Sequence, residues 1–146
     1  MPGIDTRDVP QANSLEKVAD LLALVNAGIH EDDELQIQLG LVPREIDYYR
    51  HAARILGLAV MKPSGLTPTD LGKKLLDVIS PAQHKLILFE AVRRARVFSE
   101  LLKEHNEQQL SREKVAKFLV KWTGLNPTTS NRRADTILAW LEATAL

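Results

Sequence analysis

The sequence predicts a mainly α-helical fold with one small β-hairpin, arranged as two helix-turn-helix halves packed around a central helix. Apolar residues recur at spacings of three and four along most of the chain, which is the period of an amphipathic helix. One short apolar run is followed by a Pro-Ser-Gly turn sequence, which is typical of a hairpin. A pattern of helix, turn and helix occurs twice. We therefore expect an irregular arm at residues 1–12, a first half at 13–79 and a second half at 80–146.

Composition is that of an ordinary globular chain. Of 146 residues, 45% are hydrophobic and 26% are charged, which argues against disorder. The absence of cysteine excludes a disulfide framework and a thiolate metal site, and it is compatible with a reducing cytoplasm. No apolar run approaches the roughly 18 residues of a membrane span, and the N-terminus lacks the pattern of a secretory signal. We expect a cytoplasmic protein with no membrane partner.

The formal net charge is zero, but the charge is unevenly distributed. Residues 1–41 carry two basic and eight acidic residues, a net of −6, whereas residues 110–146 carry six basic and three acidic residues, a net of +3. Residues 42–79 are also basic, with six basic against four acidic residues. The basic excess lies in the segments where we expect the ligand-binding helices. The alternative is that it is ordinary surface charge without a role in binding.

The first two helices are predicted from their apolar spacing and their ends. Asn13 or Ser14 can cap a helix over residues 15–27, and Gly28 is a natural stop. Four acidic residues, 31–34, then precede a short helix. Carboxylates favour the positive end of a helix, and the glycine turn of a calcium loop is missing, so we expect helix-start acids rather than a cation site.

The third helix and the hairpin follow directly. Pro43 suits a first helical position, and Gly57 ends the helix. Residues 58–61 read as a strand and residues 62–65 as a turn. Thr67-Pro68 is expected to cap and open a further helix to about residue 78, where Gly72 predicts close approach to a neighbouring helix. A helix-turn-helix followed by a hairpin is the order of a winged helix.

The second half reads as helices alone. Ser80-Pro81 is expected to start a long central helix that reaches about residue 105, with a break near residues 95–97. Its wide apolar face fits burial within one chain, with a homodimer interface as the alternative. Further helices are expected at 112–122 and from about residue 130 to 143, separated by a turn at 126–130. Trp122 and Trp140 lie on apolar stripes, so we expect them in the core rather than as base-stacking platforms.

Several sequence strings resemble a known family. They are NSLEKVADLL, Arg44, Tyr48-Tyr49, Ala52-Ala53, Leu56-Gly57-Leu58, Leu66-Thr67 with Gly72, Thr129, Arg132-Arg133-Ala134, Thr136 and Trp140-Leu141. Over about residues 12–143 the chain resembles the tandem winged-helix DNA-binding module of prokaryotic restriction-endonuclease and defence-associated proteins. The resemblance implies a sequence-recognition role on double-stranded DNA, in a restriction or defence system or a small transcription regulator, with a nuclease domain or partner protein beside it. A second wing would have to follow Leu141, so we expect little or no wing in the second half.

Two groups of residues are the candidate DNA contacts. An arginine in the first turn of the third helix is placed to reach base edges, and the wing tip to reach the backbone. A helix start rich in backbone N–H groups favours phosphate. The alternatives are a solvated helix face for the first group, and capping with salt bridges for the second. The candidates are Arg44, Tyr48, Arg50, His51, Arg54 and Lys62 in the first half, and Thr129, Asn131, Arg132 and Arg133 in the second.

No catalytic or metal-binding pattern is present in the sequence. The four histidines show no metal spacing, and there is no cysteine nucleophile, no Gly-x-Ser-x-Gly elbow and no phosphate-binding glycine loop. The Asp/Glu-x-Lys triplet of metal-dependent nucleases is also missing. We expect a protein that is not an enzyme and needs no cofactor or metal. The near-neutral charge keeps a second hypothesis open, a winged-helix protein–protein interaction module without DNA binding.

Overall fold

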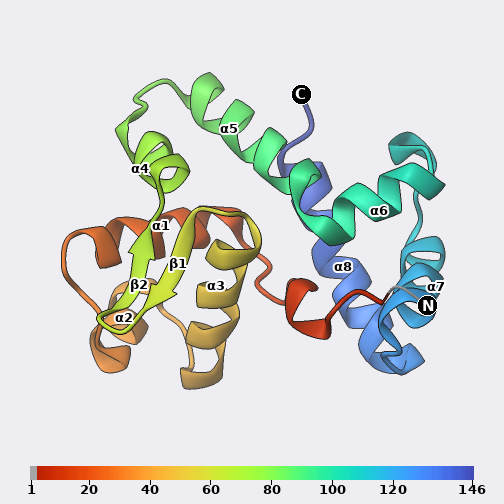
Figure 1. Ribbon diagram of the computed structural model, residues 1–146, viewed down its shortest axis with the longest axis horizontal. Coiled ribbons are helices and arrows are strands. Elements are labelled where there is room, and N and C mark those ends of the chain that lie inside the picture. Colours follow the sequence, from red (N-terminus) through yellow and green to blue (C-terminus); the bar gives the residue numbers. More distant parts are fainter. Residues whose placement is uncertain (1–2) are drawn as a thin grey trace.

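The computed structural model describes residues 3–146, which are mainly helical with one small antiparallel sheet (Figure 1). This coarse prediction is confirmed. No helix in residues 3–146 has the length and apolar character needed to cross a membrane. The elements in order are the 3-10 turn η1 (Thr6–Asp8), α1 (Leu15–Asn26), α2 (Asp32–Leu39), α3 (Pro43–Ile55), β1 (Ala59–Lys62), β2 (Gly65–Pro68), α4 (Asp70–Asp77), α5 (Pro81–Arg94), α6 (Arg96–Glu104), the 3-10 turn η2 (Glu107–Gln109), α7 (Arg112–Thr123) and α8 (Pro127–Ala143).

Helices α2 and α3 are joined by a tight turn, and the hairpin follows α3. Gly40 ends α2 in the left-handed region, at φ 65°, where glycine carries no steric penalty. Pro43 occupies the first position of α3, and the Glu45 carboxylate accepts a hydrogen bond from the Val42 N–H at 3.0 Å. Strand β1 pairs antiparallel with β2, with Lys62 opposite Gly65. The first residues of α3 and the residues at the tip of the hairpin are exposed.

The start of α4 differs from the prediction. Thr67 and Pro68 lie in β2 rather than at a helix start, because Pro68 pairs with Ala59 of β1. Thr69 caps α4 instead, and its hydroxyl accepts from the Gly72 N–H at 3.2 Å. Gly72 does mark a close approach, but mainly to backbone: a Cβ there would overlap the carbonyl oxygen of Leu58, between α3 and β1.

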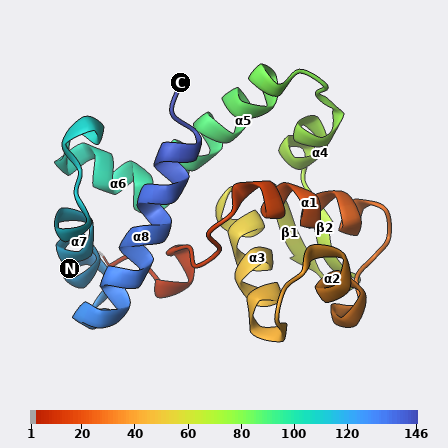
Figure 2. The same ribbon diagram turned by 180° about the vertical axis from the view of Figure 1, so that it is seen from behind.

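The expected long central helix breaks at Ala95, whose backbone is extended with ψ 140°, and α5 and α6 diverge from that point. Helix α8 lies at the centre of the second half instead, packed against α7 and α5 (Figure 2). Its Trp140 is fully buried and stacks on Phe98 with 5.7 Å between ring centroids. The start of α8 was also misplaced: Asn126 caps it and Pro127 opens it, three residues before the predicted position. Residues 80–146 contain no strand.

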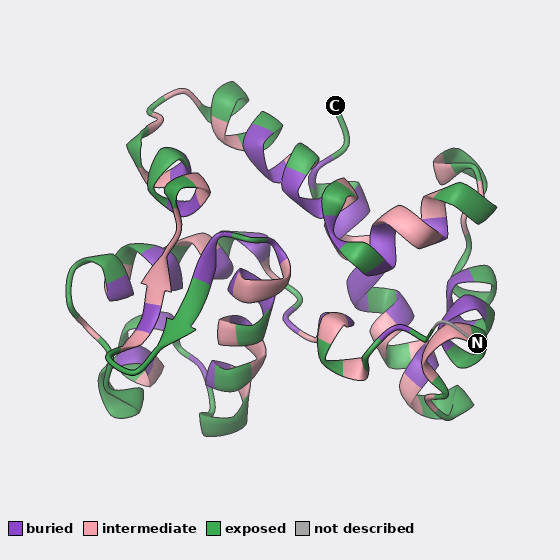
Figure 3. Ribbon diagram, viewed as in Figure 1, coloured by how far each residue is buried: buried purple, intermediate pink, exposed green. Residues whose placement is uncertain are grey.

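Residues 3–14, called the arm below, lie between α3 and α8 (Figures 1 and 2). The Ile4 N–H donates to the Trp122 carbonyl at 2.8 Å, and the Trp140 indole N–H donates to the Ala12 carbonyl at 2.7 Å. On the other side, the Ser14 N–H donates to the Tyr49 hydroxyl at 3.2 Å. Apolar residues of the arm belong to one buried cluster with residues of both halves (Figure 3). The arm thus fixes α3 relative to α8.

Candidate functional site

Candidate residues from the two halves line one cleft between α3 and α8, called the α3–α8 cleft below. Arg44 and Tyr48 come from α3, and Thr129, Arg132 and Arg133 come from α8. The cleft has a volume of about 330 Å³, and Gln11, Asn13, Asp135 and Thr136 complete its lining. Sequence alone nominated the two groups separately, one in each half. The fold brings them together because the arm holds α3 and α8 side by side.

The α3 side of the cleft carries a free cation. Arg44 is exposed in the first turn of α3, and it makes no hydrogen bond or ion pair within residues 3–146. Tyr48 follows one helical turn later, where it is half-buried. A guanidinium next to an aromatic ring and a phenolic hydroxyl can bind an anionic or planar ligand.

The α8 side carries two further cations with different surroundings. Arg132 is exposed, and its side chain makes one hydrogen bond in the described chain, a long one of 3.4 Å to the Thr129 hydroxyl. Arg133 donates to the carbonyls of Thr6 and Val9 at 2.8 and 3.3 Å. These acceptors are neutral, and burial lowers the pKa of the Arg133 guanidinium. The Nε of Arg133 is also buried without an acceptor in residues 3–146.

The one carboxylate of the cleft is already neutralised. Asp135 accepts two hydrogen bonds from Arg112 of α7, at 2.8 and 3.1 Å. Both side chains are more than half exposed, so this ion pair adds little to stability. The ion pair matters for the electrostatics of the cleft. While Arg112 holds the Asp135 carboxylate, that carboxylate interacts only weakly with the neighbouring arginines. The cleft therefore presents three guanidinium groups whose charges no carboxylate of its own lining balances.

Two predicted contacts of α3 are engaged within the protein. Arg50 forms ion pairs with Asp32 at the start of α2 and with Asp47, at 3.2 Å in the second case, and its side chain is 18% exposed. Arg54 pairs with Asp8 of the arm at 3.2 Å and donates to the Arg7 carbonyl at 2.8 Å. These arginines position α2 and the arm against α3, and sequence analysis missed this role.

The remaining candidates are spread over the same surface. His51 of α3 lies beside the arm, where it lines two further hollows of about 520 and 90 Å³, and the smaller one shares Tyr48 and Arg133 with the α3–α8 cleft. Lys62 ends β1 at the hairpin tip and is exposed. Asn131 lies in α8 and is partly buried, outside the lining of the cleft. The hairpin tip and the first turns of α3 and α8 all point toward the lower side of the molecule in Figure 1.

The arm forms part of the candidate site, which the sequence did not predict. Apart from the short turn η1 it contains no helix or strand within residues 3–14, as expected of an irregular arm, and it supplies Gln11 and Asn13 to the cleft and holds Arg133 through two carbonyls. Asn13 also accepts from the Thr136 hydroxyl of α8 at 2.6 Å. The clue available in the sequence was the presence of three apolar residues, Ile4, Val9 and Ala12, in a short segment that also carries several polar residues.

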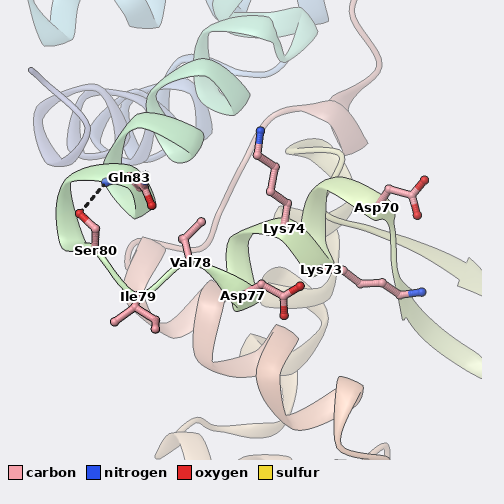
Figure 4. Close-up of a pocket in the computed structure, with 8 residues that line it drawn as sticks. All are labelled: Asp70, Lys73, Lys74, Asp77, Val78, Ile79, Ser80 and Gln83. Carbon is pink, nitrogen blue, oxygen red and sulfur yellow. Dashed lines mark hydrogen bonds between the residues drawn. The ribbon is translucent and has the colours of Figure 1, made fainter.

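A second depression lies at the junction of α4 and α5 (Figure 4). Its volume of about 800 Å³ is larger than that of the α3–α8 cleft, but it is wide open to solvent, and its two lysines lie together with two carboxylates, Asp70 and Asp77. The charged side chains extend in different directions rather than toward a common point. Within residues 3–146, no three His, Asp or Glu side chains gather in a way that could hold a metal ion. The α3–α8 cleft is therefore the stronger candidate site.

Comparison with known proteins gives one match. A family model described as "Domain of unknown function (DUF7226)" matches residues 17–143, which include both α3 and α8. No curated protein and no solved structure matches the chain.

Proposed function

The chain belongs to the DUF7226 family of domains of unknown function, and we propose that it is a non-catalytic module that binds double-stranded DNA. The observation that carries the proposal is the α3–α8 cleft, where Arg44, Arg132 and Arg133 gather without balancing carboxylates. Arginine binds phosphate through paired charge-assisted hydrogen bonds, and phosphate contacts supply most of the affinity for DNA. A cluster of unbalanced arginines between two helices suits such a ligand.

In this proposal residues 13–79 act as a winged helix. The order α1, α2, α3, β1 and β2 supports the assignment, with α3 as the recognition helix and the hairpin as the wing. Arg44, in the first turn of α3, then contacts a backbone phosphate at the edge of the major groove, and Lys62 contacts the backbone beside it. Helices α7 and α8 form the second helix pair, which contributes phosphate contacts without a wing.

The wider biological setting follows from the sequence resemblance and is part of the proposal. A chain of this kind serves as the DNA-recognition part of a prokaryotic restriction or defence system, or as a small transcription regulator in the cytoplasm. Any cleavage of DNA is then carried out by a nuclease domain or partner protein.

One observation favours a second candidate function. The groove between α3 and the hairpin contains Asp47 and is bordered by Asp5 and Asp8 of the arm, so the positive charge of Arg50 and Arg54 is balanced there. A groove of mixed charge fits a protein partner better than a polyanion. In this alternative the chain is a winged-helix protein–protein interaction module without DNA binding.

Equilibrium binding to mixed-sequence duplexes at rising salt separates the two functions. A DNA-binding module loses affinity linearly on logarithmic axes, with a slope of about −0.9 for each phosphate contacted. Arg44→Ala should weaken binding and reduce the magnitude of that slope by about 1. Arg94→Ala is the matched control, because Arg94 is an exposed arginine of α5 outside the cleft. Absence of binding at low salt would reject the DNA-binding function.

A further inference from the structure

We propose that the α3–α8 cleft is a phosphate clamp, in which one phosphate group is held between Arg44 of α3 and Arg132 of α8 while Arg133 supplies a fixed positive charge beneath it. This inference rests on the proposed function in naming a DNA backbone phosphate as the ligand. The chemistry is shared with free phosphate, so the clamp itself can be tested without DNA.

Arg133 gives the first argument. A half-buried charge is normally paired, because removing it from water costs free energy. Arg133 is bound by the carbonyls of Thr6 and Val9, and burial lowers the pKa of its guanidinium. Its charge therefore has no carboxylate partner in residues 3–146. An anion in the cleft would supply the missing partner.

The two outer arginines give the second argument. Arg44 and Arg132 line the same cleft from different helices, and both are exposed and unpaired within the described chain. A backbone phosphate has two non-bridging oxygens that share its negative charge, so each oxygen can accept hydrogen bonds from one of the two guanidinium groups. The volume of about 330 Å³ accommodates a phosphate group and exceeds the needs of one water molecule.

Asp135 gives the third argument. A carboxylate beside three arginines would ordinarily neutralise one of them, but Arg112 holds both of its oxygens from outside the cleft. Arg112 is thus a positioning residue, which keeps Asp135 from competing with the ligand. This role makes a prediction that a simple count of positive charges does not make.

Titration of the full chain with inorganic phosphate, followed by ¹H–¹⁵N spectra at constant ionic strength, tests the clamp directly. We expect saturable shifts at Arg44, Thr129 and Arg132, and a loss of affinity of about tenfold in Arg44→Ala or Arg132→Ala, from the loss of a charge-assisted contact. Arg94→Ala should bind phosphate like the wild type. Chloride at matched ionic strength should give no such shifts. Absence of saturable shifts in the cleft, or unchanged affinity in both cleft variants, would overturn the clamp.

A second set of variants, at Arg112 and Asp135, separates a positioning role of Arg112 from an effect of its charge. Arg112→Ala should weaken phosphate binding because the freed Asp135 competes, and the double variant Arg112→Ala/Asp135→Asn should recover wild-type affinity. Asp135→Asn alone should leave the affinity near that of the wild type, because Arg112 already holds Asp135, whereas an effect of net charge would strengthen binding. Weakening that persists in the double variant would contradict the role given to Arg112.

Parallel titrations with duplex DNA distinguish failure of the clamp from failure of the proposed function. Phosphate binding in the cleft without duplex binding supports the clamp as a site for free phosphate and rejects the DNA-binding function. Duplex binding that neither cleft variant changes supports DNA binding and overturns the clamp. Duplex binding that weakens in both cleft variants and is competed by phosphate supports both.

Discussion

Arg133 connects the arm to the α3–α8 cleft, because its guanidinium binds two arm carbonyls while its charge stays available to the cleft. Arg54 shows the opposite arrangement, since Asp8 balances its charge. Both arginines looked alike in the sequence, as basic residues on a helix. Their difference depends on partners 46 residues away for Arg54 and 127 and 124 residues away for Arg133, which no local pattern encodes.

Gly72 gives a prediction about packing at a single residue. Gly72→Ala should lower the free energy of unfolding by about 2 kcal/mol or more, because the new Cβ overlaps the backbone of Leu58 and backbone cannot rotate away. Gly3→Ala is the control, since its Cβ would lie at an ordinary 3.5 Å from the Trp122 carbonyl oxygen. Urea denaturation measures both. Equal stability of the two variants would contradict this packing.

Tyr49 gives a prediction about pH. Burial raises the pKa of its hydroxyl above the usual value of 10.0. As the pH rises, the unfolded chain therefore releases this proton before the folded protein does. The stability that this provides is fully present below about pH 10 and is lost as the pH rises toward the higher folded pKa. Tyr49→Phe should cost about 1 kcal/mol at pH 7, where it removes the acceptor for the Ser14 N–H. The variant should then lose less stability than the wild type between about pH 9 and about pH 11. If urea denaturation showed that the variant and the wild type lose the same stability over this pH range, the effect assigned to the Tyr49 hydroxyl would be contradicted.

At the scale of elements, local signals were enough for most of the helices. Pro43 and Gly40 define the start of α3 and the end of α2 through backbone geometry alone, and the break at Ala95 was indicated near its true place. The start of α8 was predicted too late because Asn126 and Pro127 were assigned to a turn, although they form a cap and a first helical position. The docking of the arm could not be predicted, because it depends on long-range contacts.

The arm also gives a stability prediction. Ile4 is 3% exposed and packs where the arm meets the second half, whereas Ile79 is 96% exposed between α4 and α5. Ile4→Ala should therefore destabilise the protein by about 2–5 kcal/mol, and Ile79→Ala should change stability by less than about 0.5 kcal/mol. Thermal and urea denaturation compare the two isoleucine variants directly. A negligible effect at Ile4 would show that the arm does not fix α3 against α8.

At the scale of the whole molecule, the proposed function requires the two halves to act through one surface. Sequence analysis nominated Arg44 and Arg132 in separate halves, but their shared cleft depends on the arm between α3 and α8. The hairpin tip and the starts of both helices face the same lower side of the molecule in Figure 1, and the proposed function requires one duplex to contact all three. The α4–α5 junction faces away from that side and serves as an internal reference.

The most direct test of this account is the set of backbone amides whose ¹H–¹⁵N signals move when a short mixed-sequence duplex is added at low salt. We predict movement at the start of α3, at the hairpin tip and in the first two turns of α8, with the α4–α5 junction unchanged. The same three regions should lose their shifts together as salt is raised, because the contacts share one polyanion. Shifts confined to one half, or centred on the α4–α5 junction, would contradict a single DNA-binding surface built from α3 and α8.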